Sequence, residues 1–467
     1  MTEPKAIPQQ EEEQKLWLLD HVKIPSSPTG GDFSLSALTK LELANLGLTE
    51  LPSCLPEICP SLSILFCPKN NFVEVPPLIG KCQHLQMVSF KECQTIRSIH
   101  PQALQPQLRW LILTGNQISE IPNTIGRCTR MQKLMLSGNK LEKLPSFEIW
   151  SKLANLELIR LACNKLTEPP VQLLEACPNL RWAAFAGNPF LKSETSSSLE
   201  NSEPKNNSLP ILEDPVLEKE SWPILGKGAG GVTRKVPWNG RWVAVKTFAG
   251  ELTSDGSPQD EKAISKLITA TGDDESLIQL LGETKQHGAL VMEFLDGYAA
   301  LAGPPNFETC SQDVYGEACK TNLEGFPLWK IATDTLRVLS KLHFLGVSHS
   351  DFYAHNILIQ PKNNTTTTNN NYLVKVSDFG AAFRYKDKEG NKNKSNKFAR
   401  LVETIEVRAY AVLVEELYDL LLDKTNGSCQ QSSSSSPPWK ELLEECQSPS
   451  ARFEELAKKY CYQDQNL

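Results

Sequence analysis

The sequence predicts two folded parts of different class: an α/β solenoid of stacked repeats and, behind a polar linker, a second domain with its own set of polar motifs. Three observations lead to this prediction. A leucine-rich template recurs at a nearly constant spacing through the first half of the chain. A stretch rich in Ser, Asn, Glu and Pro follows it. The chain also has 467 residues, which is too many for one ordinary hydrophobic core.

The repeated template is L-x-x-L-x-L-x-x-N-x-L-x-x-L-P, and it fits windows that begin at Leu108, Met131 and Leu156. Earlier, degenerate copies bring the number to about seven over residues 36–191. These copies resemble leucine-rich repeats. Their asparagine slots follow one another at intervals of 23, 25 and 24 residues, at Asn116, Asn139, Asn164 and Asn188.

Each copy is expected to form a short strand at its L-x-L core, with the leucines pointing inward. One copy cannot bury its own apolar face, so the copies must stack. The asparagine side chain is suited to hydrogen-bond backbone groups of neighbouring turns that would otherwise be buried without partners.

Alternate strand positions should line the concave face of this array. They are Ile64, Met87, Trp110, Lys133, Leu158 and Trp182, with Phe66, Ile112 and Arg160 two positions further along. Exposed aromatic side chains on a rigid surface favour protein binding. The candidate partner contacts are Phe66, Trp110, Ile112 and Trp182. The alternative is that Trp110 and Trp182 pack under neighbouring side chains.

The composition of other segments sets the domain boundaries. Residues 1–35 read as a flexible or capping N-terminus, 192–217 as a flexible linker, and 218–467 as the second domain. Residues 363–371 and 430–438 are of low complexity and are expected to be solvated loops within that domain.

Four motifs of the second domain stand in a fixed order: "ILGKGAGGV", "RWVAVKTF", "HSDFYAHN" and "SDFG". Together they resemble the protein kinase catalytic domain over about residues 218–467. The resemblance implies an α+β fold of two lobes, a small sheet-rich lobe from about Ser221 to Leu295 and a helical lobe after it. It also implies ATP as substrate, Mg²⁺ as cofactor and a nucleotide site between the lobes.

The resemblance assigns catalytic roles to four residues. Asp351 would orient the acceptor hydroxyl and accept its proton, and Lys246 would contact the phosphates. Asn356 and Asp378 would be the metal ligands, since they offer hard oxygen donors. Glu261, on an expected helix, would hold the lysine, with the neighbouring Asp260 as its rival.

Further residues would surround the nucleotide. The glycines let the backbone approach the phosphates, Ala244 would cover the adenine, and Met292 would stand at the back of the pocket. A lone glycine loop can also be an ordinary turn. The candidate ATP-binding residues are Gly226, Gly228, Gly231, Val232, Ala244, Lys246, Glu293 and Leu295.

The second domain departs from the family pattern at several points. Ser350 replaces the usual arginine, so regulation through a phosphate contact at that residue is not expected. Tyr353 stands where serine/threonine kinases have a lysine that contacts the transferred phosphate, and the arginine that tyrosine kinases place nearby is also absent. Glu406 lies only 26 positions after Gly380, and Arg452 lacks its customary glutamate. The resemblance implies an ATP-dependent protein kinase, with serine or threonine favoured because these are the usual acceptors in the family. Tyr353 and the short segment before Glu406 favour the alternative, a nucleotide-binding pseudokinase scaffold.

Composition excludes other classes of function. The net charge is −7 and no basic stripe is present, so nucleic acid is not an expected partner. The sequence has no apolar run long enough for a membrane span. The 13 cysteines, such as Cys67 and Cys163, are scattered at apolar positions, which is typical of reduced core thiols. A cytoplasmic location is expected.

Overall fold

The computed structural model describes residues 7, 10–21, 34–191, 210–213, 215–228, 230–250, 252–253, 255–272, 274–324, 326–360, 372–385, 395–424 and 437–461. Most of the expected linker, 192–209, lies outside these residues, as do 363–371 and 430–436. The chain divides into two compact units. The first comprises Met1–Leu180, Gly187–Phe190 and Leu252–Asp255, and the second comprises Arg181–Ala186, Leu191–Glu251 and Gly256–Leu467.

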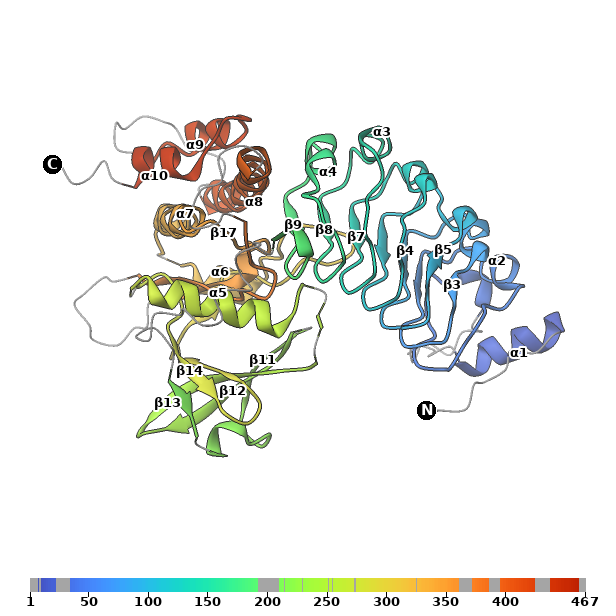
Figure 1. Cartoon of the computed structure of the whole chain (residues 1–467), viewed down its shortest axis with the longest axis horizontal. Helices are drawn as coiled ribbons and strands as arrows, with labels where there is room; N and C mark the ends of the chain where they lie inside the picture. Colours follow the sequence, from blue (N-terminus) through green and yellow to red (C-terminus); the bar gives the residue numbers. More distant parts are fainter. Residues whose placement is uncertain are drawn as a thin grey trace. The chain divides into compact units, whose positions relative to one another are not determined.

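The first unit consists of short strands that alternate with single helical turns (Figure 1). Its strands are β1 (Lys40–Glu42), β2 (Ile64–Phe66), β3 (Glu74–Val75), β4 (Met87–Ser89), β5 (Ser98–Ile99), β6 (Trp110–Ile112), β7 (Lys133–Met135) and β8 (Leu158–Arg160). Its helices are α1 (Glu11–His21), η1 (Leu35–Ala37), α2 (Leu55–Ile58), η2 (Pro77–Lys81), η3 (Pro101–Ala103), η4 (Asn123–Arg127), α3 (Phe147–Trp150) and α4 (Val171–Ala176), and the turn η5 (Pro189–Leu191) follows.

One strand from each repeat enters a parallel sheet in the order β1, β2, β4, β6, β7 and β8. The register stacks equivalent repeat positions on one another. The middle residues form a buried column, in which Leu111 pairs with Leu134 and Leu134 with Ile159. The repeat spacing therefore places the apolar side chains of successive turns in one continuous core.

The predicted role of the repeat asparagines is confirmed. Asn139 donates through Nδ2 to the carbonyls of Leu113 and Leu136, both at 2.9 Å, and its Oδ1 accepts from Ile118 N at 3.0 Å. Asn164 makes the same set of contacts one turn later. The residue before Asn139 is Gly138, whose φ of 68° lets the backbone turn into this position.

The prediction that aromatic side chains stand exposed on the strand face is wrong for Trp110 and Trp182. Trp110 is only 8% exposed because Lys133, its partner on the next strand, places Nζ 4.4 Å from the centre of its ring. Trp182 is 1% exposed. Phe66 and Ile112 are half-buried, so they retain accessible surface.

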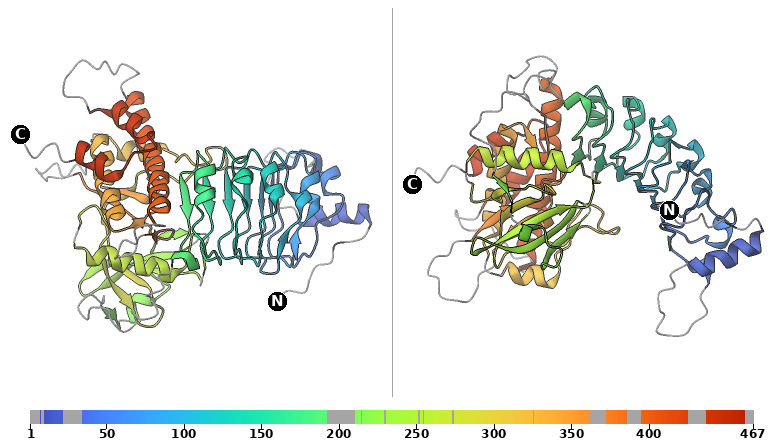
Figure 2. Two further views of the ribbon diagram at one scale, coloured as in Figure 1. Left: turned by 45° about the horizontal axis from the view of Figure 1, so that its top comes forward. Right: turned by 60° about the horizontal axis from the view of Figure 1, so that its bottom comes forward.

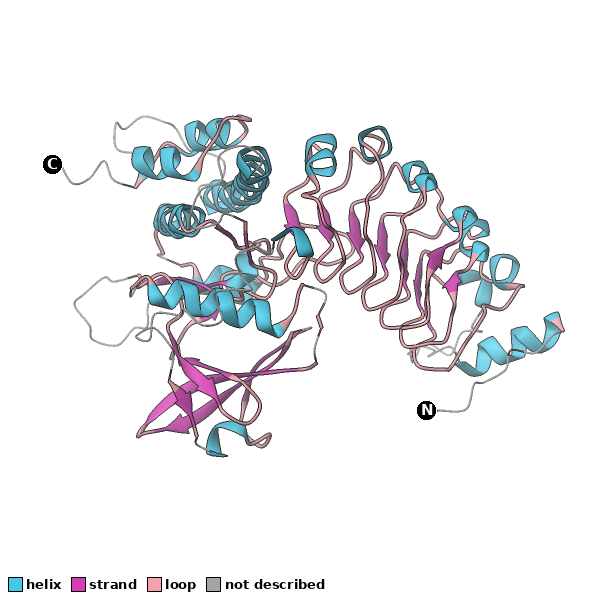
Figure 3. Cartoon of the chain, in the orientation of Figure 1, coloured by secondary structure: helices cyan, strands magenta, loops and turns pink. Residues whose placement is uncertain are grey.

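The second unit contains a sheet-rich part and a helical part, and Figure 3 separates them by colour. Its strands are β9 (Trp182–Ala184), β10 (Ile211–Leu212), β11 (Ile224–Gly228), β12 (Gly231–Trp238), β13 (Arg241–Phe248), β14 (Leu280–Thr284), β15 (Leu290–Glu293), β16 (Ala299–Ala300), β17 (Val347–Ser348), β18 (Ile357–Ile359), β19 (Val374–Val376) and β20 (Phe383–Arg384). Its helices are η7 (Pro215–Glu218), α5 (Pro258–Ala270), α6 (Glu317–Asn322), α7 (Leu328–Phe344), η8 (Ala354–Asn356), α8 (Ser395–Lys424), α9 (Trp439–Cys446) and α10 (Phe453–Tyr460).

The largest sheet formed by the described residues of this unit has six strands in the order β10-β14-β15-β13-β12-β11. Helix α5 lies beside it, between the sheet and helices α7 and α8 (Figure 1). The helix begins at Ser257, whose Oγ accepts from Asp260 N at 3.2 Å, and Pro258 fills its first turn. The cap fixes the first turn of α5, which contains Asp260 and Glu261.

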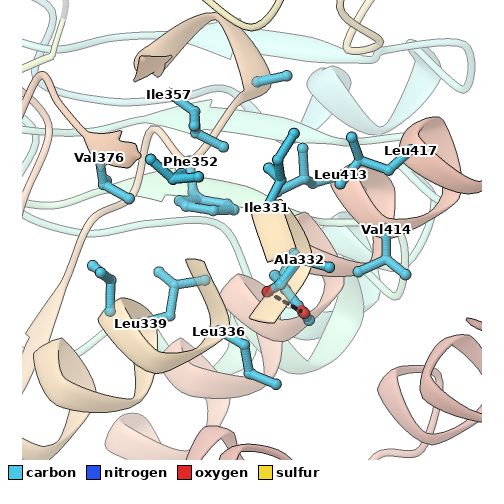
Figure 4. Close-up of a cluster of buried hydrophobic side chains, with 14 of the residues drawn as sticks. Ile331, Ala332, Leu336, Leu339, Phe352, Ile357, Val376, Leu413, Val414 and Leu417 are labelled. Carbon is cyan, nitrogen blue, oxygen red and sulfur yellow. Dashed lines mark hydrogen bonds between the residues drawn. The ribbon is translucent and has the colours of Figure 1, made fainter. Parts of the chain in front are cut away.

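The helical part is built around α7 and the long helix α8, which is drawn in red in Figure 2. Apolar side chains from both helices meet residues of β18 and β19 in one buried cluster (Figure 4). Tyr410 of α8 also donates its hydroxyl to the carbonyl of Ala332 on α7, at 2.9 Å. The cluster holds the loop between β17 and β18, where the motif "HSDFYAHN" lies.

Candidate functional site

Lys246 lies on β13 with its ammonium between two carboxylates. Its Nζ is 2.5 Å from Glu261 Oε1 and 3.2 Å from Asp378 Oδ1. Glu261 is buried in the first turn of α5. Asp260, the alternative lysine partner that the sequence allowed, instead accepts a hydrogen bond from the Ser257 hydroxyl at 2.6 Å and belongs to the N-terminal cap of the helix. The structure therefore brings Glu261 and not Asp260 to the lysine.

The ion pairs shift the protonation of both partners. Burial favours the neutral amine, yet the negative charges of Asp378 and Glu261 raise the pKa of Lys246 above its usual value. Partial desolvation opposes ionisation of Asp378, whose side chain is 51% exposed, but the charge and hydrogen bond of Lys246 hold the pKa of its carboxyl below the usual range. At neutral pH the site therefore presents a fixed cation beside a fixed carboxylate.

Asp351 and Asn356 are joined within the loop that follows β17. Asn356 Nδ2 donates to the Asp351 carbonyl at 2.8 Å and to its Oδ2 at 3.2 Å. Ser377 then donates to the Asn356 carbonyl, through N at 2.9 Å and through Oγ at 2.7 Å. Ser377 directly precedes Asp378, so hydrogen bonds and one peptide bond connect all four residues assigned to catalysis. Oxygen donors of Asn356 and Asp378 are a set that suits Mg²⁺.

Glu406 of α8 organises the backbone just before Asp351. It is fully buried and accepts from Ser350 N at 2.6 Å, from His349 N at 3.1 Å and from Ser348 Oγ at 3.0 Å. His343 donates through Nε2 to Oε2, the oxygen that also accepts from His349 N, at 2.6 Å. Although burial opposes ionisation, the hydrogen bond and charge of His343 hold the pKa of Glu406 below its usual value.

Ser350 takes part in this arrangement through its backbone and hydroxyl. Its φ is 64°, and its Oγ lies 2.8 Å from Ser348 Oγ. A left-handed residue at this position turns the chain so that consecutive amides face Glu406. Ser350 thus fixes the loop without the charge that an arginine would bring.

The three candidate glycines differ in what their surroundings require. A Cβ at Gly226 or Gly228 would meet no atom within 4 Å, so both leave open space beside β11 and β12. A Cβ at Gly231 would lie 2.0 Å from the Thr247 carbonyl oxygen, and its φ is 147°. Close packing of β12 on β13 therefore explains Gly231, whereas strand packing does not explain Gly226 and Gly228. Val232 follows Gly231 in β12, and its carbonyl accepts from Thr247 Oγ1 at 3.1 Å.

The residues expected around adenine lie on β13 and β15 or just after them. Ala244 is buried and pairs with Met292 across the two strands. Glu293 is the last residue of β15, and its side chain forms an ion pair with Lys375, with 2.5 Å between Oε1 and Nζ. Leu295 follows and is half-buried. The backbone of this segment therefore lies at the end of a central strand of the sheet, and the side chain of Glu293 is turned toward β19.

Tyr353 is buried by another aromatic residue of the second unit. Its ring is stacked on that of Trp182, with 4.3 Å between centroids and 6° between planes. Trp182 Nε1 also donates to the carbonyl of Phe352 at 3.0 Å. This explains why Trp182 is buried, and it shows that the side chain at position 353 is held by stacking next to Asp351.

Two partners in this unit were not foreseen from the sequence. Arg452 pairs with Glu403 of α8, with 3.8 Å between Nε and Oε2. Asp313 binds His355 in the loop, with 2.7 Å between Oδ1 and Nδ1. Each pair joins residues more than 40 positions apart, and no local pattern marks either acidic partner.

Comparison with protein families identifies two of these segments. Residues 220–423 match the model of the protein kinase domain, and residues 107–128 match that of the leucine-rich repeat. The recognition of both modules from sequence is confirmed.

Two relatives from Arabidopsis thaliana share parts of the chain. A "Probably inactive leucine-rich repeat receptor-like protein kinase" is 49% identical over 47 residues, which are 10% of this chain and 6% of that protein. The disease resistance-like protein DSC1 is 28% identical over 183 residues, which are 36% of this chain and 14% of that protein. The chain thus spans a small fraction of the length of either relative. Among the described residues, no helix has the length and apolar character needed to cross a membrane.

Proposed function

We propose that this chain, which contains a protein kinase domain and a leucine-rich repeat ahead of it, is an ATP-dependent protein kinase. The proposed acceptors are protein hydroxyls, with serine and threonine favoured, and the repeats are proposed to recruit a protein partner. One observation carries the proposal. Lys246 is paired with Glu261 and Asp378, and Asn356 is hydrogen-bonded to Asp351. Ser377 connects the two groups, because it donates a hydrogen bond to Asn356 and directly precedes Asp378.

Each of these residues has a separate task in phosphoryl transfer. Lys246 offers a cation to the phosphates, and Glu261 keeps that cation in place when substrate is absent. Asp351 accepts the proton of the acceptor hydroxyl, and the amide of Asn356 orients its carboxylate. Asn356 and Asp378 would hold Mg²⁺, which when bound neutralises charge on the phosphates. Positioning of this kind is worth about 7–11 kcal/mol of barrier in well-oriented reactions.

The nucleotide is proposed to lie against β11, β12 and β13. Gly226 and Gly228 leave open space there, and Ala244 presents a small buried side chain. The absence of Cβ atoms at the two glycines lets backbone amides approach phosphate oxygens. The proposed nucleotide contacts also include Gly231, Val232, Glu293 and Leu295.

A partner surface on the repeats is a further part of the proposal. Phe66 on β2 and Ile112 on β6 are half-buried. Each is the second of the two outward-facing residues of its strand. Lys133 and Trp110 form a cation–π contact between the neighbouring strands β7 and β6, at outward positions of the same face. A cytoplasmic location stays a prediction.

A pseudokinase scaffold is the second candidate, and a specific observation favours it. Tyr353 stands where the family has a lysine that contacts the transferred phosphate. The residue is only 6% exposed, and its ring is stacked on that of Trp182. A stacked, neutral side chain at this position cannot neutralise a transferred phosphate. Binding of Mg²⁺ and ATP without transfer is therefore the alternative.

The two candidates are separated by transfer of labelled phosphate from γ-labelled ATP. The acceptors are the chain itself, dephosphorylated casein and a Glu/Tyr copolymer, the last of which reports tyrosine transfer. The variant is Asp351→Asn, and the matched control is Asp419→Asn on the exposed face of α8. We expect labelling of casein by the wild type and the control and its loss, by about a hundredfold or more, in Asp351→Asn.

Equal labelling by the wild type and Asp351→Asn excludes the active kinase. Thermal unfolding with Mg²⁺ and ATP then tests the scaffold. At a nucleotide concentration of 100 times Kd, binding stabilises the folded state by about 2.7 kcal/mol. A shift without transfer supports the pseudokinase, and no shift excludes nucleotide binding altogether.

A further inference from the structure

The loop that carries Asp351 and Asn356 is clamped from one side by a single carboxylate. Asp313 Oδ2 accepts from His355 N at 3.0 Å, and Asp313 Oδ1 lies 2.7 Å from His355 Nδ1. A carboxylate can only accept, so the imidazole proton on this side resides on Nδ1. Asp313 therefore binds both the backbone amide and the imidazole ring of His355, and His355 directly precedes Asn356.

The side chain of Asp313 is itself fixed and desolvated. It is 1% exposed, whereas that of His355 is 23% exposed. Gly303 and Val314 exchange backbone hydrogen bonds, 2.8 and 2.9 Å long, which pin the segment next to Asp313. Since the carboxylate is buried and the ring partly accessible, Asp313 is the rigid member of the pair.

Helix α8 anchors the same segment through Glu416. Asp313 N donates to Glu416 Oε1 at 3.0 Å, and the Tyr315 hydroxyl donates to Oε2 at 3.1 Å. Burial, and after it the negative charge of Asp313, raise the pKa of Glu416 to about 8. Glu416 is thus largely neutral at pH 7, and Asp313 carries the negative charge that faces the loop.

The clamp acts at the residue that sets the position of Asn356. His355 and Asn356 are consecutive in the single turn η8, and Asn356 Nδ2 bonds Asp351. The charged and titratable groups around His355 are Asp313, Asp351 and Asp378, with the ring of Tyr353 at 5.1 Å. Burial opposes the charge on His355, but the hydrogen bond and charge of Asp313 raise its pKa above the usual value.

We infer that Asp313 is a positioning residue for the catalytic loop, and that it acts through His355 to hold Asn356 in place as a metal ligand and Asp351 in place as the base. The inference rests on the proposed function. Residues that orient a metal ligand through one intermediate contact typically change metal affinity or activity by about 10–100-fold when they are replaced.

The test replaces Asp313 by Asn in the full chain, which preserves shape and removes charge. We expect two effects. The concentration of Mg²⁺ needed for half-maximal binding of a fluorescent ATP analogue should rise about tenfold, and kcat for labelling of casein should fall about 10–100-fold with little change in KM for casein. The control is Glu308→Gln in the same segment, since Glu308 is exposed, and it should leave both quantities within twofold of wild type.

Two further variants distinguish positioning from a general structural effect. His355→Gln changes the other partner of the same contact. Since His355 is more exposed than Asp313, this variant stays informative where Asp313→Asn fails to fold. In the double variant the losses should not add, because both changes break one interaction.

The inference is overturned when Mg²⁺ dependence stays within twofold of wild type in both single variants, or when the losses of the two variants add fully. Its failure is distinguishable from failure of the proposed function. Where the wild type transfers no phosphate, the Mg²⁺ dependence of nucleotide binding still measures the position of Asn356.

Discussion

Lys246 and Glu261 form an ion pair with 2.5 Å between Nζ and Oε1, and their side chains are 13% and 8% exposed. The pair connects β13 with helix α5. A buried charge that loses its partner is costly, and Lys246 would then depend on Asp378 alone. The pair therefore governs both the position of the lysine and the docking of α5 on the sheet.

Replacement of Glu261 by Gln should weaken nucleotide binding by about tenfold, equivalent to about 1.4 kcal/mol, because the ammonium is no longer held. Unfolding in urea should also show a loss of about 1–3 kcal/mol. The matched control is Asp260→Asn, one residue earlier, which disturbs only the cap of α5. Should Asp260→Asn weaken nucleotide binding more than Glu261→Gln, the assignment of the lysine partner is wrong.

Glu416 gives a prediction for the pH dependence of stability. Its pKa is about 8 in the folded chain against a usual value of 4.5. Between these values the folded state binds one proton more than the unfolded state, so stability falls as the pH rises. The greatest slope from one such group is about 1.4 kcal/mol per pH unit.

The measurement is the free energy of unfolding of the wild type and Glu416→Gln from pH 5 to pH 9. The amide cannot ionise, so the variant should lose less stability than the wild type as the pH rises. The difference between the two should grow through this range and level off above pH 8. Parallel curves for the two proteins are incompatible with a raised pKa of Glu416.

The repeat asparagines predict the stability of the first unit. Asn139→Ala leaves Ile118 N and the carbonyls of Leu113 and Leu136 without their side-chain partner. We expect a loss of about 2–4 kcal/mol, since buried groups left unpaired cost about 1–3 kcal/mol each and part of the cost relaxes. Hydrogen exchange of the full chain should show the loss in residues 113–139.

The control for this change is Asn155→Ala. Asn155 is exposed and donates one hydrogen bond, to the Thr129 carbonyl at 2.8 Å. Its replacement should cost less than about 1 kcal/mol. An equal cost for the two variants would mean that burial of the asparagine does not determine its contribution.

Local sequence patterns anticipated much of this structure. The repeat spacing located the strands and the asparagines because each repeat contacts its neighbour at the same relative position. The order of motifs in the second half located Lys246, Asp351, Asn356 and Asp378, because each motif fixes a short turn or strand. These features depend on residues that are close in sequence or related by a constant period.

Features that depend on partners distant in the sequence could not be predicted from it. The exposure of Trp110 was misjudged because Lys133, on the next strand, covers its ring. The partner of Arg452 is Glu403, which sits on a helix whose register the sequence does not mark. Asp313 reaches His355 across 42 positions, and an isolated aspartate in a loop carries no pattern. These contacts are determined by tertiary packing, which the periodicity of the sequence does not reveal.

Trp182 gives the last prediction, because its indole binds the residue that follows Asp351. Trp182→Phe removes the hydrogen bond from Nε1 to the Phe352 carbonyl and keeps an aromatic ring against Tyr353. We expect a loss of stability of about 0.5–1.5 kcal/mol, as for one buried hydrogen bond. Trp182→Ala removes the stack as well and should cost about 3–5 kcal/mol. Urea unfolding measures both, and Phe344→Ala, at an exposed position of α7, is the control for loss of an aromatic ring. If Trp182→Ala costs no more stability than Trp182→Phe, stacking on Trp182 does not hold the ring of Tyr353 in place beside Asp351.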